Sequence, residues 1–216
     1  MILGIIPARG GSKGIPRKNI KLIQGHPLIA WTIKDALASK LLDRFVVSTE
    51  DLEIKEISLK YGAEVLDRPP ELAGDTVISR EVVAHALRSQ GADLAVLLQA
   101  TSPIRRSGLI DKVIKAFQTG DYDSLSTGFN QLNYPPHGVE HRRQDLESVF
   151  VNDGSVIVSK AATIFANSLF GAKAGVYLTT REENIDIDDN FDFWLASKVL
   201  EKGLNEGWLS PPQTKR

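Results

Sequence analysis

The chain has 216 residues, 42% hydrophobic and 25% charged, a composition typical of a soluble globular protein with a sizeable core. Its formal net charge of −1 argues against a general basic surface for nucleic acid or an anionic membrane, so positive charge must act locally. Cysteine is absent, which excludes disulfides and thiolate metal sites, and no apolar run approaches the roughly 20 residues of a membrane span. We therefore expect a cytoplasmic protein without nucleic-acid or membrane partners.

Short apolar runs alternate with helical patterns through the first two thirds of the chain. Strands are predicted at 2–7, 44–49, 63–68 and 93–99, and helices at 27–40, 51–62, 75–91 and 107–120. Asp75 or Thr76 is the expected cap of the third of these helices. This alternation predicts the α/β class, a three-layer sandwich around a mostly parallel, Rossmann-like mixed sheet.

The regular alternation of strand and helix patterns ends after about residue 123. Strands are predicted at 123–129, 154–160 and 175–179, and a helix runs from about Asp189 to Glu201. Between the first two strands, residues 130–150 are polar and rich in turn formers. With no internal repeat and no long linker, residues 1–216 are expected to form a single domain with a short excursion at about 130–150.

A glycine-rich and basic segment, ARGGSKGIPRKN at 8–19, follows the first strand directly. Ligands of doubly wound sheets bind where loops leave the carboxyl ends of the strands. The three glycines of this loop let backbone N–H groups converge on an anion. Its basic side chains can donate charge-assisted hydrogen bonds to phosphate: Arg9, Lys13, Arg17 and Lys18. The spacing is neither that of a P-loop nor Gly-x-Gly-x-x-Gly. The segment predicts a phosphate-binding loop, with a solvated basic loop as the alternative.

A second candidate site is the sequence IDID at 185–188. In an extended backbone Asp186 and Asp188 point to one face, and Ile185 and Ile187 point to the other. Two hard oxygen ligands on one face suit Mg²⁺ or Mn²⁺. The alternative role for these acids is to cap the last helix, a role that we expect Asp189 or Asn190 to take.

The segment IIPARGGSKGIPRKNI at 5–20 resembles the N-terminal signature of the acylneuraminate cytidylyltransferases. These are the CMP-sialic acid synthetases and their relatives for other nine-carbon 2-keto sugar acids. Further blocks follow in the order of the family: VVSTED, RPPELAGDT, LLQATSPIR, RRQDLE and IDIDDNFDF. The resemblance implies the fold of the nucleotide-diphospho-sugar transferases and a Mg²⁺-dependent (or Mn²⁺-dependent) reaction. In that reaction CTP is joined to the anomeric hydroxyl of a sugar acid, and pyrophosphate leaves.

The resemblance also assigns roles to residues of the nucleotide side. It implies nucleotide binding by Ala8, Arg9, Ser12, Lys18, Asn19, Arg68, Ala73 and Asp75. Of this set, the resemblance places Arg9, Ser12 and Lys18 on the triphosphate. It places Asn19 and Arg68, with the backbone near Ala73 and Asp75, around the cytidine. Metal binding is implied for Asp186 and Asp188, and the residues expected to act directly in catalysis are Arg9, Lys18 and Asp188.

The sugar side is expected after the apolar strand 93–99. Residues leaving this strand reach the same sheet edge as the basic loop, and the implied substrate-binding set is Gln99, Thr101, Ser102, Arg105 and Arg143. Either of the two arginines can pair with the substrate carboxylate, because a guanidinium binds a carboxylate in bidentate fashion.

The chain departs from its relatives at two places. Similar enzymes carry a longer excursion before the RRQD block, and many sialic-acid-specific members have Arg-Pro-Asn-Gly where this chain has Val151 to Gly154. The sugar is therefore open among N-acetylneuraminate, legionaminate and deaminated neuraminate. A homodimer is expected through Tyr134, Pro135, Pro136 and the region of Val149 and Phe150. The alternatives are a nucleotide-binding module without turnover and a nucleotidyltransferase for a different sugar acid or sugar phosphate.

Overall fold

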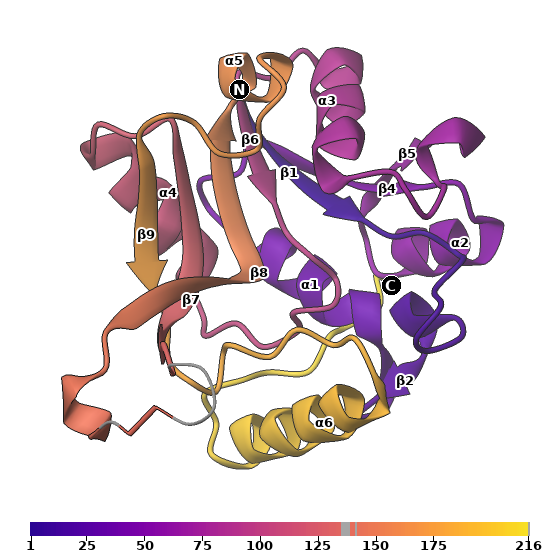
Figure 1. Cartoon of the computed structure of the whole chain (residues 1–216). Coiled ribbons are helices and arrows are strands. Elements are labelled where there is room, and N and C mark those ends of the chain that lie inside the picture. The colour runs from indigo at the N-terminus through magenta and orange to yellow at the C-terminus, as the bar shows by residue number, and fades with distance from the viewer. Residues whose placement is uncertain (135–138, 141, 216) are drawn as a thin grey trace.

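The computed structural model describes residues 1–134, 139–140 and 142–215, and a seven-stranded sheet forms its centre (Figure 1). The strand order is β5-β4-β1-β6-β8-β7-β9. The strands are β1 (Ile2–Pro7), β4 (Arg44–Thr49), β5 (Glu64–Asp67), β6 (Leu94–Leu97), β7 (Ser124–Leu132), β8 (Ser148–Lys160) and β9 (Ala174–Leu178). Neighbouring strands pair in parallel, except that β8 is antiparallel to both β6 and β7. The predicted mostly parallel mixed sheet is confirmed.

Helices cover both faces of the sheet (Figure 1). On one face lie α1 (Leu28–Ala38), α2 (Leu52–Lys60) and α4 (Leu109–Thr119), and on the other α3 (Ser79–Gln90) and α5 (Ala161–Phe165). The alternation along β1 explains this division, because Leu3 and Ile5 pack toward α3 and α5 while Ile6 packs toward α1. These side chains are fully buried, so β1 is an interior strand of the sheet with core packed on both of its faces.

The last helix, α6 (Asn190–Asn205), lies along the bottom of the view in Figure 1. Its Ala196 and Leu200 form a third apolar cluster with Ile15 of the basic loop, Trp31 of α1 and Ile187. This cluster fixes the loop after β1 against the segment that precedes α6. Among the described residues, no helix has both the length and the apolar character needed to cross a membrane.

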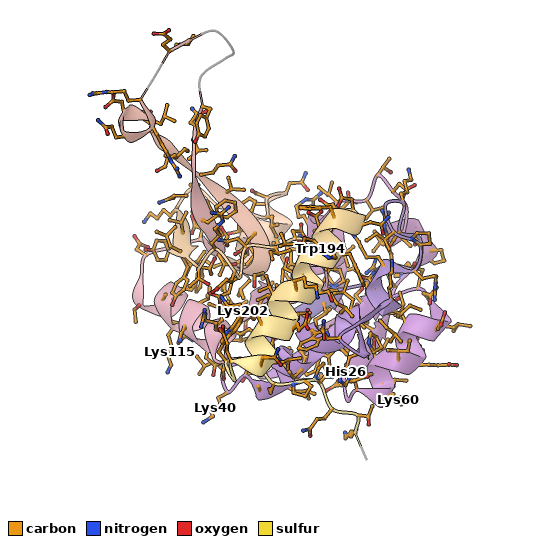
Figure 2. All side chains as sticks on the ribbon, turned by 90° about the horizontal axis from the view of Figure 1, so that it is seen from below. His26, Lys40, Lys60, Lys115, Trp194 and Lys202 are labelled. Atoms are coloured by element: carbon orange, nitrogen blue, oxygen red, sulfur yellow. The ribbon has the colours of Figure 1, made fainter. Side chains whose placement is uncertain are left out.

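Three features differ from the sequence predictions. The helix α3 begins at Ser79 after an extended Ile78, so neither Asp75 nor Thr76 caps it, and the Asp75 side chain pairs with loop cations instead. The short hairpin of β2 (Leu22–Ile23) and β3 (His26–Pro27) was not predicted, and neither was α5. Finally, β7 and β8 extend into the polar segment 130–150, and their excursion reaches outward from the rest of the protein (Figure 2).

Candidate active site

A cavity of about 450 Å³ opens where the carboxyl ends of β1, β5 and β6 meet the segment before α6. This is the edge at which open α/β sheets bind their ligands. The predicted site residues among its walls are Arg9, Ser12, Lys18, Asn19, Arg68, Asp75, Gln99, Thr101, Asp186 and Asp188. Residues far apart in sequence, from the basic loop and from the acidic IDID segment, therefore line one hollow.

Gly14 brings the basic loop into close contact with the acidic segment. A Cβ atom at Gly14 would lie 2.3 Å from the carbonyl oxygen of Asp188, so a side chain does not fit there without a backbone shift. The Lys18 ammonium, whose side chain is 13% exposed, donates a hydrogen bond to the Ile187 carbonyl and lies 3.6 Å from an Asp188 carboxylate oxygen. Lys18 thus links the two parts of the site and places a positive charge beside the acidic pair.

The remaining cations of the loop have separate partners. Arg9 and Lys13 lie 2.9 and 2.7 Å from the two carboxylate oxygens of Asp75. Arg17 lies toward the start of α2, where it pairs with Asp51 at 2.5 Å and lowers the pKa of that carboxyl to about 2. Arg9 and Lys13 therefore face the cavity, whereas Arg17 fastens the loop from outside it.

The wall after β5 is built around Arg68. This side chain is 6% exposed, and it donates hydrogen bonds to the backbone carbonyl and the hydroxyl of Ser48. Glu50 lies between Arg68 and the basic loop: one carboxylate oxygen accepts from the Gly10 N–H at 2.8 Å, and the other is 3.8 Å from the Arg68 guanidinium. Burial lowers the pKa of Arg68, and the Glu50 charge opposes that shift. The sequence reasoning missed Glu50, although an acid directly after a buried strand was a visible signal.

Of the three other residues predicted to bind the nucleotide, one lines the cavity, one is buried in the core and one lies between two residues that line the cavity. The Asn19 amide donates to the Arg9 carbonyl at 3.0 Å and so holds the loop in shape while lining the cavity. Ala8 is buried in the core, and its N–H donates to the Ser48 carbonyl. Ala73 is half-buried, and its neighbours Leu72 and Gly74 line the cavity.

The IDID segment has the predicted alternation. Ile185 and Ile187 are buried, while Asp186 and Asp188 are exposed and line the cavity. The Ile187 N–H donates to the Thr101 carbonyl at 2.9 Å, which keeps the segment extended beside the loop after β6. Protein surrounding the Asp186 carboxyl raises its pKa, as does the negative charge of Asp188, while the Thr101 hydroxyl and the Lys18 charge act in the opposite direction.

The alternative capping role falls to other acids. The Asp189 carboxylate accepts from the backbone N–H groups of Phe191 and Asp192, and the Asp192 carboxylate accepts in return from the N–H groups of Asp188 and Asp189. This reciprocal arrangement is a capping box, and it confirms Asp189 as the N-cap of α6. The side chains of the IDID pair are not used as caps.

A divalent cation fits this pair of carboxylates. No group of three or more His, Cys, Asp or Glu side chains with metal-binding geometry occurs within the part of the chain that the structure describes. Mg²⁺ does not need such a group, because it keeps several waters and binds through one or two carboxylates together with substrate phosphates. Asp186 and Asp188 place two carboxylates at the wall of a cavity that Arg9, Lys13 and Lys18 also line.

The sugar-side predictions separate into two groups. Gln99 and Thr101 line the cavity, but the structure does not bring the other three residues to it. Ser102 is fully buried and donates to the Asp153 carbonyl at 2.8 Å. Arg105 is 1% exposed and engaged with protein acceptors, so this geometry does not support its expected contact with a substrate carboxylate. Arg143 is exposed on η3 (Arg143–Asp145) and lines a different cavity of about 1030 Å³.

Solved structures define the class of the fold. The chain superposes on CMP-2-keto-3-deoxy-manno-octonic acid synthetase with a TM-score of 0.71 at 13% identity, covering 93% of this chain and 98% of that one. A cytidylyltransferase from Leptospira borgpetersenii gives a TM-score of 0.66 at 16% identity, covering 100% and 98%. The fold is therefore that of the cytidylyltransferase-type nucleotidyltransferases.

Sequence comparisons identify the family. The sequence model of the cytidylyltransferase family matches residues 3–192. An N-acylneuraminate cytidylyltransferase of Escherichia coli is 33% identical over 93% of this chain and 52% of its own length. N-acylneuraminate cytidylyltransferase A of Danio rerio is 32% identical over 94% and 51%. The chain belongs to the cytidylyltransferase family, and the resemblance to acylneuraminate cytidylyltransferases is confirmed. It spans about half the length of these curated relatives.

Proposed function

We propose that this chain transfers a cytidylyl group from CTP to the anomeric hydroxyl of a nine-carbon 2-keto sugar acid, giving the CMP-sugar and pyrophosphate. The names of the curated relatives support this activity. The observation that carries it is the meeting of the basic loop and the acidic pair in one cavity, joined by Lys18.

The loop holds the triphosphate in this proposal. Arg9 and Lys13 exchange their shared partner Asp75 for phosphate oxygens, a replacement of one anion by another. Ser12 and Lys18 complete the cradle, and Lys18 lies between the phosphates and Asp188. Arg68 and Asn19 also line the cavity, and we assign them to the cytidine.

Mg²⁺ or Mn²⁺ is the proposed cofactor, held by Asp186 and Asp188. When bound, such a cation neutralises charge on the reacting phosphate and on the leaving pyrophosphate. The protein residues orient the site around it: Thr101 holds the acidic segment through the Ile187 N–H, and Lys18 balances part of the negative charge of the pair.

The sugar acid lies next to Gln99 and Thr101 in this proposal, because these residues line the cavity beside the acidic pair. Their polar groups suit the hydroxyls of a sugar. The nonulosonic acid itself is to be chosen among N-acetylneuraminate, legionaminate and deaminated neuraminate by assay. A cytoplasmic location fits a chain without cysteine.

We also propose a homodimer that uses the β7–β8 excursion. Tyr134 and Val149 on this excursion are 58% and 45% exposed, and Val176 and Leu178 of the neighbouring edge strand β9 are 54% and 55% exposed. Apolar side chains on one edge suit a two-fold contact between copies. Pro135 and Pro136, also expected in this contact, lie outside the described residues. Light scattering at micromolar concentration tests the proposal: a dimer mass is expected, and a monomer mass contradicts it.

The function is tested by pyrophosphate release with CTP and the three sugar acids, beside CTP binding by calorimetry. Metal-dependent release with at least one acid is expected. CTP binding without release on every acid would favour a nucleotide-binding module. A sugar phosphate is added to the panel as a fourth substrate, and release with it alone would favour the other alternative.

A further inference from the structure

The fully buried guanidinium of Arg105 lies between two loops at the carboxyl edge of the sheet. Its Nε and Nη2 donate to the Ser155 carbonyl at 3.0 and 2.9 Å, and Nη2 also donates to the Gln99 carbonyl at 2.8 Å. Its Nη1 donates to the Thr32 hydroxyl of α1 at 2.9 Å. The Arg105 side chain thus joins three elements to one another: the loop after β6, the turn within β8, and α1.

The turn within β8 is a local bulge. Pairing between β7 and β8 is regular up to Ser126 opposite Ile157 and resumes at Gly128 opposite Asn152, so the residues between Asn152 and Ile157 depart from regular pairing as a bulge. Gly154 lies at the top of this bulge with φ +67, and a Cβ there would be 2.1 Å from the Gln99 side-chain oxygen. The Gln99 N–H donates to the Gly154 carbonyl at 3.3 Å. The bulge therefore sets where Gln99 lies.

We propose that Arg105 is a positioning residue that fixes Gln99 against the bulge at the sugar side of the cavity, and that it does not bind the substrate carboxylate. This inference rests on the proposed function only for its kinetic consequence. The hydrogen bonds of Arg105 hold Gln99 and the bulge together whatever reaction the cavity supports.

The chemistry of the position favours arginine over lysine. A planar guanidinium can hold two carbonyls and a hydroxyl at once, whereas an ammonium is a point donor that cannot span them with the same geometry. The charges of three carboxylates, those of Asp35, Asp153 and Asp186, favour the buried positive charge. Asp35 is 3.9 Å away. Burial lowers the pKa of Arg105, and these three carboxylates oppose that shift.

The first test measures amide hydrogen exchange in Arg105→Lys, which keeps the positive charge and removes the planar guanidinium with its several N–H donors. Exchange at the Gln99 and Ser155 amides is expected to speed up by about tenfold or more, the scale of losing a charged hydrogen bond. Arg106→Lys is the matched control, because the half-exposed Arg106 pairs with Glu182 outside the site cavity. Unchanged exchange at both amides in Arg105→Lys overturns the proposal.

The second test compares a sugar acid with its carboxamide in the wild-type and Arg105→Lys proteins. A positioning residue lowers kcat/KM by the same factor for both substrates, while CTP affinity stays within about twofold. A residue that binds the carboxylate loses its effect when the carboxylate is removed. A loss confined to the acid would therefore overturn the inference.

The role of Arg105 can still be tested if Arg105→Lys does not fold or if the wild type is inactive. If Arg105→Lys does not fold, Thr32→Val takes its place, because it removes the hydroxyl that accepts from Arg105 at nearly constant volume. This hydroxyl also donates to the Gln99 carbonyl at 3.4 Å, so the readout is the amide of Ser155, whose carbonyl accepts from Arg105. Faster exchange at the Ser155 amide is expected, and unchanged exchange there overturns the proposal. If the wild type releases no pyrophosphate with any acid, the proposed function fails, while the exchange experiment still decides the role of Arg105.

Discussion

Gly14 offers a sharp test of the contact between the basic loop and the acidic segment. In Gly14→Ala the new Cβ would start 2.3 Å from the Asp188 carbonyl oxygen, so one backbone must move by about 1 Å to restore a normal contact. Because Asp186 and Asp188 lie on the moved segment, the proposed metal ligands shift relative to the loop cations. A misplacement of this size costs about 10²-fold in turnover, and overpacking of this kind costs about 1–3 kcal/mol of stability.

Gly11→Ala is the matched control for this substitution. Among the described residues nothing lies within 4 Å of a Cβ at Gly11, so that variant is expected to keep wild-type stability and wild-type Mg²⁺ dependence. The assay is kcat for pyrophosphate release over a Mg²⁺ titration, beside thermal unfolding. Gly14→Ala is expected to lose turnover and to need more Mg²⁺. Equal turnover and equal Mg²⁺ dependence in the two variants would refute the close contact.

Three further predictions concern single charges. Lys18→Ala is expected to lower kcat/KM for CTP by about 10²-fold in steady-state assays, because it removes a charge-assisted contact and frees the acidic segment, and unchanged kinetics would remove Lys18 from the site. Asp186→Asn and Asp188→Asn are each expected to abolish most turnover with little change in circular dichroism, and full Mg²⁺-dependent activity in both would contradict the metal assignment. Asp51→Asn keeps the cap of α2 but loses the Arg17 ion pair, so at pH 7 it should lower the free energy of unfolding by about 1 kcal/mol, discounted because Arg17 is partly exposed. The pKa of Asp51 is lowered from 3.8 to about 2, so this stabilisation is present above pH 3.8 and is lost as the pH falls toward 2; in denaturant titrations the two proteins should converge there, and a constant difference would refute the pairing.

Local patterns in the sequence were sufficient for much of the fold. The apolar runs of β1 and β4 predicted those strands with the bounds that the structure has. The period of two in IDID predicted which side chains are buried and which face the cavity. These features depend on neighbours a few residues apart, which sequence patterns record directly.

The parts that failed depend on partners distant in the chain. Asp75 is a residue type that often caps helices, and it lies just before a helical pattern. Its carboxylate instead pairs with two cations of the basic loop, more than sixty residues earlier in the chain. Arginine is usually exposed and often binds anionic ligands, which is why Arg105 was expected to contact the substrate. The structure instead surrounds it with two carbonyls and a hydroxyl from three other segments. The position of Glu50 after β4 was visible in the sequence, but its contact with the Gly10 N–H depends on the register between β1 and β4. Sequence patterns do not record such tertiary partners.

The central claim is that the basic loop and the acidic pair form one site for cytidylyl transfer. Phosphorus NMR of the protein with CTP, Mg²⁺ and N-acetylneuraminate, legionaminate or deaminated neuraminate tests it most directly, because it reports which phosphate bond breaks. The expected result is loss of the CTP signals with growth of a pyrophosphate signal and of one phosphodiester signal, that of a CMP-sugar, in a two-to-one ratio of phosphorus. Persistence of CTP with every acid, or its conversion to CDP and phosphate, would contradict the account.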